Sequence, residues 1–274
     1  MSINQGHNIF SLFERFEGRE QALREIKRFH IHPTMFYRSS LWTHSKHLVW
    51  IMKAMAPHIK EVFGESFNQA KAEIMGCIHD DFEIVMGDVQ AGQKKKMDNK
   101  QLDQLDLQEK KAIEEISRRF PENIGPYNYK DLLNSIQQAD SLEAQVIKFA
   151  DKIDAFGESL HEIYGGNYKF MQSISDPIYG DIPAPLDYYV SFITSFPKQF
   201  PQIAKLFEQE FSLFEKPVKM NFVKIAKKRN PHTKESLKID TGYTHYDAWM
   251  KIMLEYADDE ELQNLYTQKE FLTK

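Results

Sequence analysis

Apolar residues recur every three or four positions along most of the chain, which is the spacing of amphipathic helices. Between Leu48 and Met55 they fall at i, i+3, i+4 and i+7, and His44 lies one helical turn earlier on the same face. No stretch convincingly alternates apolar and polar residues as a half-buried strand does. The sequence therefore predicts an all-α protein. Besides the helix around Leu48, helices are expected over 8–30, 67–78, 107–120, 142–160, 187–214 and 244–270.

The regions between these helices indicate the domain organisation. Residues 87–99 and 173–185 contain glycines or prolines and no periodicity, so both are expected to be loops. The composition changes at Lys216, where a segment with eight lysines and arginines and one acid begins. We therefore expect a helical domain over residues 1–215 and a helical C-terminal appendage of unknown role over residues 216–274.

Composition limits where the protein works and what it binds. A net charge of −5 gives no general attraction to nucleic acid. The single cysteine, Cys77, excludes an internal disulfide and fits a reducing compartment, and it is expected to pack in the core. The N-terminal region is rich in charges, and no apolar run reaches the roughly 18 residues of a membrane span. We expect a cytoplasmic protein with neither a membrane nor a nucleic-acid partner.

The stretch from Cys77 to Asp88, CIHDDFEIVMGD, places one histidine and four acids among apolar residues. Burying so many ionisable groups is costly unless they are paired or bind a metal, so the stretch is either a solvated helix end or a metal site. A lone histidine on an apolar face is more often a core residue than a ligand. Two imidazoles and two carboxylates from three helices, however, together suit a divalent metal bound inside a helical bundle. These groups are His44, His79, Asp80 and Asp151.

The order of these residues, H…HD…D, resembles the HD-domain metal-dependent phosphohydrolases, and more narrowly their bacterial 5′-deoxynucleotidase branch. The matching segments are RSSLWTHS (38–45), HDDFEIVMGD (79–88) and IKFADKIDAFGESLHEIYGGNYKF (147–170). The resemblance covers roughly residues 20–170. The HD pair alone is weakly specific, whereas HDxxE followed by GD, in order with the other two segments, is much more so. The fold that this implies is an HD-domain helical bundle with a helical C-terminal extension.

The resemblance also implies the ligands and the catalytic acids. His44, His79, Asp80 and Asp151 would hold one divalent ion, for which Mn, Co, Mg, Zn and Fe are all candidates. Glu83 matches the family's catalytic acid.

Further positions match the family's nucleotide-binding residues. Asp88 matches the acid of the GD motif, which contacts the sugar side of the nucleotide, and Arg38 matches an arginine that holds phosphate. Arg28 and Phe29 correspond to a pair that binds phosphate and deoxyribose, with Phe29 where tryptophan is usual. Two departures affect this region: Thr43 replaces the usual acid before the first histidine, and the spacing from Arg38 to His44 is one residue shorter than expected.

The function that follows is removal of the 5′-phosphate from nucleoside monophosphates, with the nucleotide as a small-molecule partner and homo-oligomerisation left open. An alternative is hydrolysis of a nucleotide pyrophosphate or alarmone, although those enzymes carry an acid where this chain has Ile84. A second alternative is a degenerate HD module that only binds nucleotide. Three acids that follow Asp151 at i+3, i+7 and i+11 are interpreted as a solvated stripe. These acids are Asp154, Glu158 and Glu162.

Overall fold

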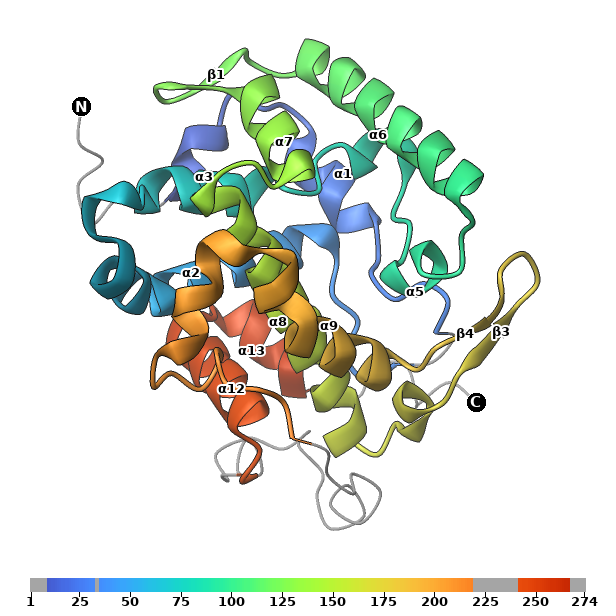
Figure 1. Ribbon diagram of the computed structural model, residues 1–274. Coiled ribbons are helices and arrows are strands. Elements are labelled where there is room, and N and C mark those ends of the chain that lie inside the picture. Colours follow the sequence, from blue (N-terminus) through green and yellow to red (C-terminus); the bar gives the residue numbers. More distant parts are fainter. Residues whose placement is uncertain (1–8, 33–34, 219–240, 267–274) are drawn as a thin grey trace. The chain divides into compact units, whose positions relative to one another are not determined.

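The computed structural model describes residues 9–32, 35–218 and 241–266 (Figure 1). These residues are mostly helical, with two small two-stranded sheets, which confirms the predicted all-α class. The α-helices are α1 (Arg19–Glu25), α2 (Leu41–Phe63), α3 (Gln69–Ile78), α4 (Glu83–Met86), α5 (Ala91–Lys94), α6 (Asn99–Arg119), α7 (Tyr129–Gln138), α8 (Leu142–Tyr164), α9 (Pro185–Gln199), α12 (Thr244–Tyr256) and α13 (Asp259–Tyr266). Short 3-10 helices are η1 (Ile9–Phe13), η2 (Gly64–Ser66), η3 (Tyr168–Met171) and η4 (Pro201–Glu208). The strands are β1 (Asn123–Ile124), β2 (Tyr127–Asn128), β3 (Ile174–Asp176) and β4 (Gly180–Ile182).

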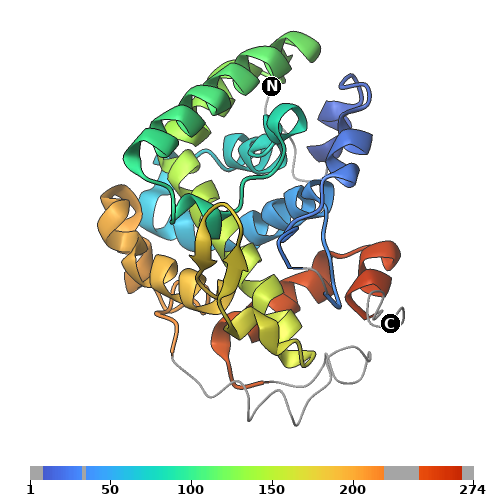
Figure 2. The ribbon, with the colours of Figure 1, turned by 90° about the vertical axis from the view of Figure 1, so that its right-hand side faces the viewer.

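The two segments predicted to be loops are more ordered than their composition suggested. Residues 87–99 contain the short helix α5, and residues 173–185 contain the antiparallel hairpin β3–β4, in which Ile174 pairs with Ile182 (Figure 2). Helix α6 begins at Asn99, earlier than predicted, because the Asp98 side chain accepts the Gln101 N–H at 2.8 Å and caps the helix. Helix α7 was not predicted.

The described residues form two compact units. Of the described residues, the first contains 9–28, 40–88 and 98–150. In it α2 packs against α3, and α6 against α7. The apolar positions that predicted α2 and α3 are its fully buried core, as expected from their helical spacing. These positions include Leu48, Ile51, Met52, Met55, Ile74, Cys77 and Ile78.

The second unit contains, of the described residues, 29–32, 35–39, 89–97, 151–218 and 241–266. In it the C-terminal helix α12 lies against the second half of α8. The Trp249 ring sits so close to Gly157 that a Cβ atom at this glycine would lie 2.3 Å from Trp249 Cγ. Only glycine therefore permits this contact. Residues 219–240, which include most of the basic segment, and residues 267–270 of the last predicted helix lie outside the described residues.

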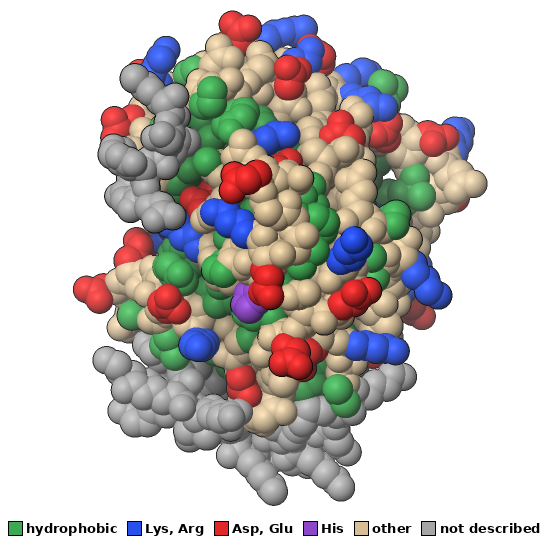
Figure 3. All heavy atoms as spheres, turned by 60° about the vertical axis from the view of Figure 1, so that its left-hand side comes forward, with side chains coloured by type: hydrophobic (Ala, Val, Ile, Leu, Met, Phe, Trp, Pro, Cys, Tyr) green, Lys and Arg blue, Asp and Glu red, His purple; other side chains and the backbone are tan. Residues whose placement is uncertain are grey.

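The surface carries charges of both signs. On the face shown in Figure 3, acidic and basic side chains are interspersed among apolar ones. This distribution agrees with the small net charge. Within the described ranges, no helix has both the length and the apolar character required to cross a bilayer.

Candidate metal and phosphate site

Two histidines and an aspartate meet in the first unit. His44 lies on α2 shortly after Ser40, whose side chain accepts the Thr43 N–H and caps the helix. His79 and Asp80 directly follow α3. Nε2 of His79 lies 2.9 Å from Asp80 Oδ2, and Nε2 of His44 lies 3.7 Å from the same oxygen. The structure thus brings three of the four predicted ligands together.

The hydrogen bonding of His79 indicates which of its nitrogens would face a cation. Nδ1 lies 3.0 Å from the backbone oxygen of Gly76, which only accepts, so Nδ1 carries the proton of the neutral ring. Nε2 then faces the Asp80 carboxylate, and two acceptors at this distance repel each other unless a proton or a metal cation lies between them. A ligand histidine usually donates its other N–H to a carbonyl or a carboxylate in the same way. The side chains therefore fit a divalent cation.

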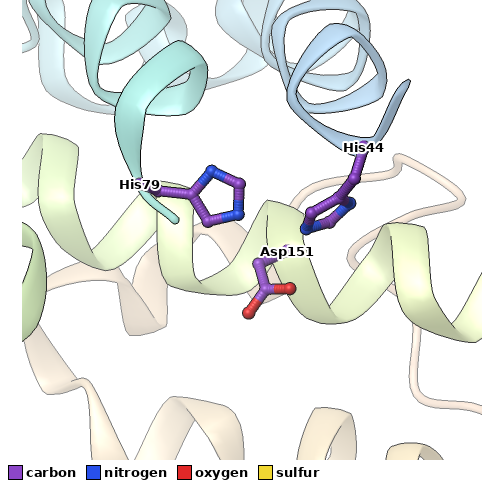
Figure 4. A group of neighbouring side chains, drawn as sticks. All are labelled: His44, His79 and Asp151. Atoms are coloured by element: carbon purple, nitrogen blue, oxygen red, sulfur yellow. The ribbon is translucent and has the colours of Figure 1, made fainter. Parts of the chain in front are cut away.

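Asp151 lies in the middle of α8, directly after Ala150. One nitrogen each of His44 and His79 and one oxygen of Asp151 lie within 4.8 Å of one another. Figure 4 shows the three side chains approaching one another from α2, the end of α3 and α8. The Asp151 carboxylate also pairs with Lys152, whose Nζ lies 2.6 Å from Oδ2. Burial would lower the pKa of Lys152, but Asp151 raises it above its usual value, so the Lys152 ammonium is charged at neutral pH.

Asp81, next to Asp80 in the sequence, pairs with Arg19 and not with the two histidines. Its carboxylate is buried and accepts Nε and Nη2 of Arg19, each at 2.7 Å, and the Tyr129 hydroxyl at 2.8 Å. Arg19 is also buried and donates to the backbone oxygen of Cys77 at 2.5 Å. This bidentate pair therefore ties α1 and α7 to the end of α3. This pair was not predicted, because no residue near Asp81 in the sequence indicates a partner 62 residues away.

The remaining predicted residues of the first unit are Glu83, Asp88 and Arg28. Glu83 is the first residue of α4 and is buried. Its N–H bonds to the Asp80 carbonyl at 2.9 Å, so the two acids occupy adjoining turns. Gly87 ends α4 with a φ of 79°, a conformation that favours glycine, and the half-buried Asp88 follows it. Arg28 is 8% exposed.

Arg38 and Phe29 lie in the second unit, in the described residues 29–32 and 35–39, which we call the 29–39 loop. The guanidinium of Arg38 donates to the backbone oxygens of Phe29 at 3.0 Å and of His32 at 2.6 Å, which closes the loop on itself. Phe29 has a φ of 53°, which is rare for an aromatic residue and is typical of backbone held by its surroundings at functional sites. The His32 ring stacks on Phe170 at 4.4 Å. Burial, together with the charge of Arg38, lowers the pKa of His32 to about 4, so this ring is neutral at physiological pH.

The acids that follow Asp151 on α8 are fully buried, so the interpretation as a solvated stripe was wrong. Each carboxylate accepts a hydrogen bond from another residue of the second unit. Asp154 accepts Trp249 Nε1 at 2.8 Å, and Glu158 accepts the Ser39 hydroxyl at 2.9 Å. Glu162 accepts three N–H groups, including two from the backbone of the 29–39 loop. Burial raises the pKa of Glu162 to about 7, although these donors favour the ionised form.

Comparisons with known proteins identify a matching family, related sequences and a related fold. Residues 18–176, more than half of the chain, match the family model of YfbR-like 5′-deoxynucleotidases. A 5′-deoxynucleotidase of Vibrio vulnificus is 26% identical over 130 residues, which cover 46% of this chain but only 64% of that protein, less than two thirds of its length. A 5′-deoxynucleotidase of Klebsiella pneumoniae is 24% identical over 169 residues, which cover 59% of this chain and 82% of that protein. Among solved structures, a Pyrococcus horikoshii protein shares the fold, with a TM-score of 0.50 and 18% identity over 69% of this chain and 91% of that one.

Proposed function

The chain belongs to the YfbR-like 5′-deoxynucleotidase family, and from this premise we propose that it removes the 5′-phosphate from deoxynucleoside monophosphates with the help of one divalent metal ion. The observation that carries the proposal is the group formed by His44, His79 and Asp151, with Asp80 beside both histidines. Imidazole nitrogens and carboxylate oxygens in this mixture suit first-row transition metals or magnesium.

In this proposal, the four ligands hold the ion and the other residues act on the substrate. When bound, a divalent ion supplies Lewis-acid activation of a phosphoryl oxygen and of the attacking water. Glu83 takes a proton from the water or gives one to the leaving nucleoside oxygen, since it lies one turn beyond Asp80. Arg38 binds the phosphate and offsets its negative charge. Two of the five N–H donors of its guanidinium bond to carbonyls of its own loop, which leaves at most three for phosphate.

The packing of Ile84 argues against the pyrophosphate alternative. This residue stands where those enzymes carry a second acid, and it packs against the apolar cluster of Leu23, Leu41 and Trp42. An apolar side chain in this position offers no oxygen to a second phosphate or to a metal. The monophosphate therefore remains the substrate that fits best.

A substrate panel tests the activity directly. The purified protein, loaded in turn with manganese, cobalt, magnesium, zinc or iron(II), is given deoxy- and ribonucleoside mono-, di- and triphosphates, and released phosphate is measured. We expect turnover of the deoxynucleoside monophosphates. Release of pyrophosphate from triphosphates, or of phosphate from none of these substrates, contradicts the proposal.

Two variants test the division of roles. Asp80→Ala should lose metal and activity together, because it deletes a ligand. Glu83→Ala should keep the metal and lower kcat by about 10²–10⁴-fold, the usual contribution of a positioned acid or base. Metal content and steady-state kinetics separate the two outcomes. Loss of metal in Glu83→Ala would make Glu83 a ligand, and unchanged kcat would remove it from the reaction.

A further inference from the structure

The loop that carries Arg38 donates hydrogen bonds to buried carboxylates of other elements. Glu162 on α8 accepts the N–H of Phe36 at 3.0 Å and of Tyr37 at 2.7 Å. One turn earlier on α8, Glu158 accepts the Ser39 hydroxyl at 2.9 Å with both of its oxygens. The residues before and after Arg38 are therefore both bonded to the same helix. This arrangement leaves the backbone at Arg38 little freedom to move.

A third carboxylate reaches the loop from the C-terminal helices. The Tyr37 hydroxyl donates a short hydrogen bond to Glu261 on α13, and both side chains are buried. Burial, with the charge of Glu261 beside it, raises the pKa of Tyr37 well above its usual value, so the phenol remains a donor. The backbone N–H of Glu261 is in turn bound by the Asp258 side chain at 2.8 Å, which fixes the start of α13.

Helices α12 and α13 are themselves anchored to α8. Trp249 on α12 packs on Gly157 and donates to Asp154. His161 on α8 is fully buried, with Nε2 3.1 Å from the backbone oxygen of Leu265 and Nδ1 3.0 Å from the Tyr246 hydroxyl. Because the carbonyl only accepts, Nε2 carries the proton and Nδ1 accepts from the tyrosine. The C-terminal helices thus have both the contacts and the rigidity needed to hold the loop.

We propose that α12 and α13 form a positioning element for substrate binding, in which Glu261 holds Tyr37 and thereby fixes the neighbouring Arg38. These helices lie outside residues 18–176, which match the family, so the element is an addition to the matched domain. The inference rests on the proposed role of Arg38 in binding phosphate. A displacement of about 1 Å at a positioning residue can lower activity by about 100-fold, so a small relaxation of the loop is measurable.

The test uses the full chain and removes, in turn, each partner of the contact between the Tyr37 hydroxyl and Glu261. Tyr37→Phe removes the hydroxyl and keeps the ring, and it should raise KM for a deoxynucleoside monophosphate about tenfold, with kcat changed less than about threefold, because Arg38 acts in substrate capture. Glu261→Leu should match it, whereas Glu261→Gln keeps an acceptor oxygen and should stay within about twofold of the wild type. In an Arg38→Ala background, Tyr37→Phe should add less than about twofold, since coupled residues are not additive.

A matched control removes a hydroxyl from the same C-terminal segment at a residue outside the proposed anchor. Tyr243→Phe deletes the hydroxyl of the residue just before α12, whose ring packs against Phe156 and His245, and should leave KM unchanged. Hydrogen exchange of the Phe36 and Tyr37 amides, measured without substrate, should accelerate in Tyr37→Phe and not in Tyr243→Phe.

Each outcome bears on one claim. Unchanged exchange in Tyr37→Phe, or an effect on KM that is fully additive with Arg38→Ala, overturns the positioning role. If the wild type hydrolyses no nucleoside monophosphate, the proposed function fails, and the exchange experiment alone decides whether the C-terminal helices hold the loop.

Discussion

Two adjacent aspartates should respond in opposite ways to the same substitution. Asp80 lies beside His44 and His79, while Asp81 is committed to Arg19 and Tyr129. We predict that Asp80→Asn loses the metal and keeps the fold. Asp81→Asn should instead keep the metal and lose stability, because an asparagine accepts only one of the two Arg19 donors and turns an N–H toward the other.

The size of the loss in Asp81→Asn follows from burial. The side chains of Arg19 and Asp81 are 2% and 1% exposed, so the substitution leaves a guanidinium charge buried without its counterion. Breaking such a pair typically costs about 3–5 kcal/mol of unfolding free energy. With an unfolding entropy of about 2.1 cal/mol/K per residue, the 274-residue chain should lose about 5–9 °C in Tm if it unfolds in one step.

The assay combines thermal or urea unfolding with metal content, measured at a temperature where every variant is folded. Tyr129→Phe serves as the matched control, since it removes one neutral donor from the same carboxylate and should cost only about 1 kcal/mol. Replacing the pair together, as Arg19→Met with Asp81→Leu, should recover most of the stability that Asp81→Asn loses, because no unpaired charge remains.

Two results would refute this reasoning. If Asp81→Asn unfolds at the wild-type temperature, the buried pair contributes nothing and the Arg19 charge is compensated elsewhere. If folded Asp81→Asn has lost its metal while Asp80→Asn retains it, the two aspartates have been assigned the wrong roles.

Three further predictions concern other contacts. Gly157→Ala should destabilise the chain by about 1–3 kcal/mol, because its Cβ would overlap Trp249; urea unfolding measures this, and wild-type stability would show that α12 moves aside freely. Burial lowers the pKa of His245 to about 4, below the value of about 6.5 in an unfolded chain, so the stability that the neutral ring contributes is complete above pH 6.5 and is lost as the pH falls toward 4. His245→Gln should therefore reduce the loss of unfolding free energy between pH 6.5 and pH 4 by up to about 3 kcal/mol, and equal pH profiles of the variant and the wild type would contradict this. Cys77 is buried and its pKa is raised, so a thiol reagent should modify it only after unfolding, and rapid labelling of the native protein would be the contrary result.

The sequence was sufficient to predict the helices whose apolar residues repeat over several turns. Helices α2 and α8 each extend over 23 residues, so their periodicity was unambiguous. Helix α7 has 10 residues and a short apolar stripe that includes Leu132, Leu133 and Ile136, which is too brief to stand out from chance. The hairpin β3–β4 was missed for a similar reason, since each strand has only three residues.

Candidate site residues could be identified from the sequence where a motif contained them, whereas contacts that depend on a distant partner could not. The HD pair with His44 and Asp151 could be identified from their order along the chain. Glu158 and Glu162 could not be interpreted correctly, because their spacing on α8 is also the spacing of a solvated face. Their donors come from a loop about 120 residues earlier, and pairing over such a distance depends on the tertiary fold alone.

The self-closed loop around Arg38 affects the entropy of binding. A free arginine on a surface samples many rotamers, and immobilising such a side chain on binding costs about 0.5–1.5 kcal/mol. Here the guanidinium is already held by the carbonyls of Phe29 and His32, so in the proposed role of Arg38 as a phosphate ligand its ordering would be completed during folding and not on binding. A pre-ordered arginine of this kind gains affinity without forming any additional contact with its ligand.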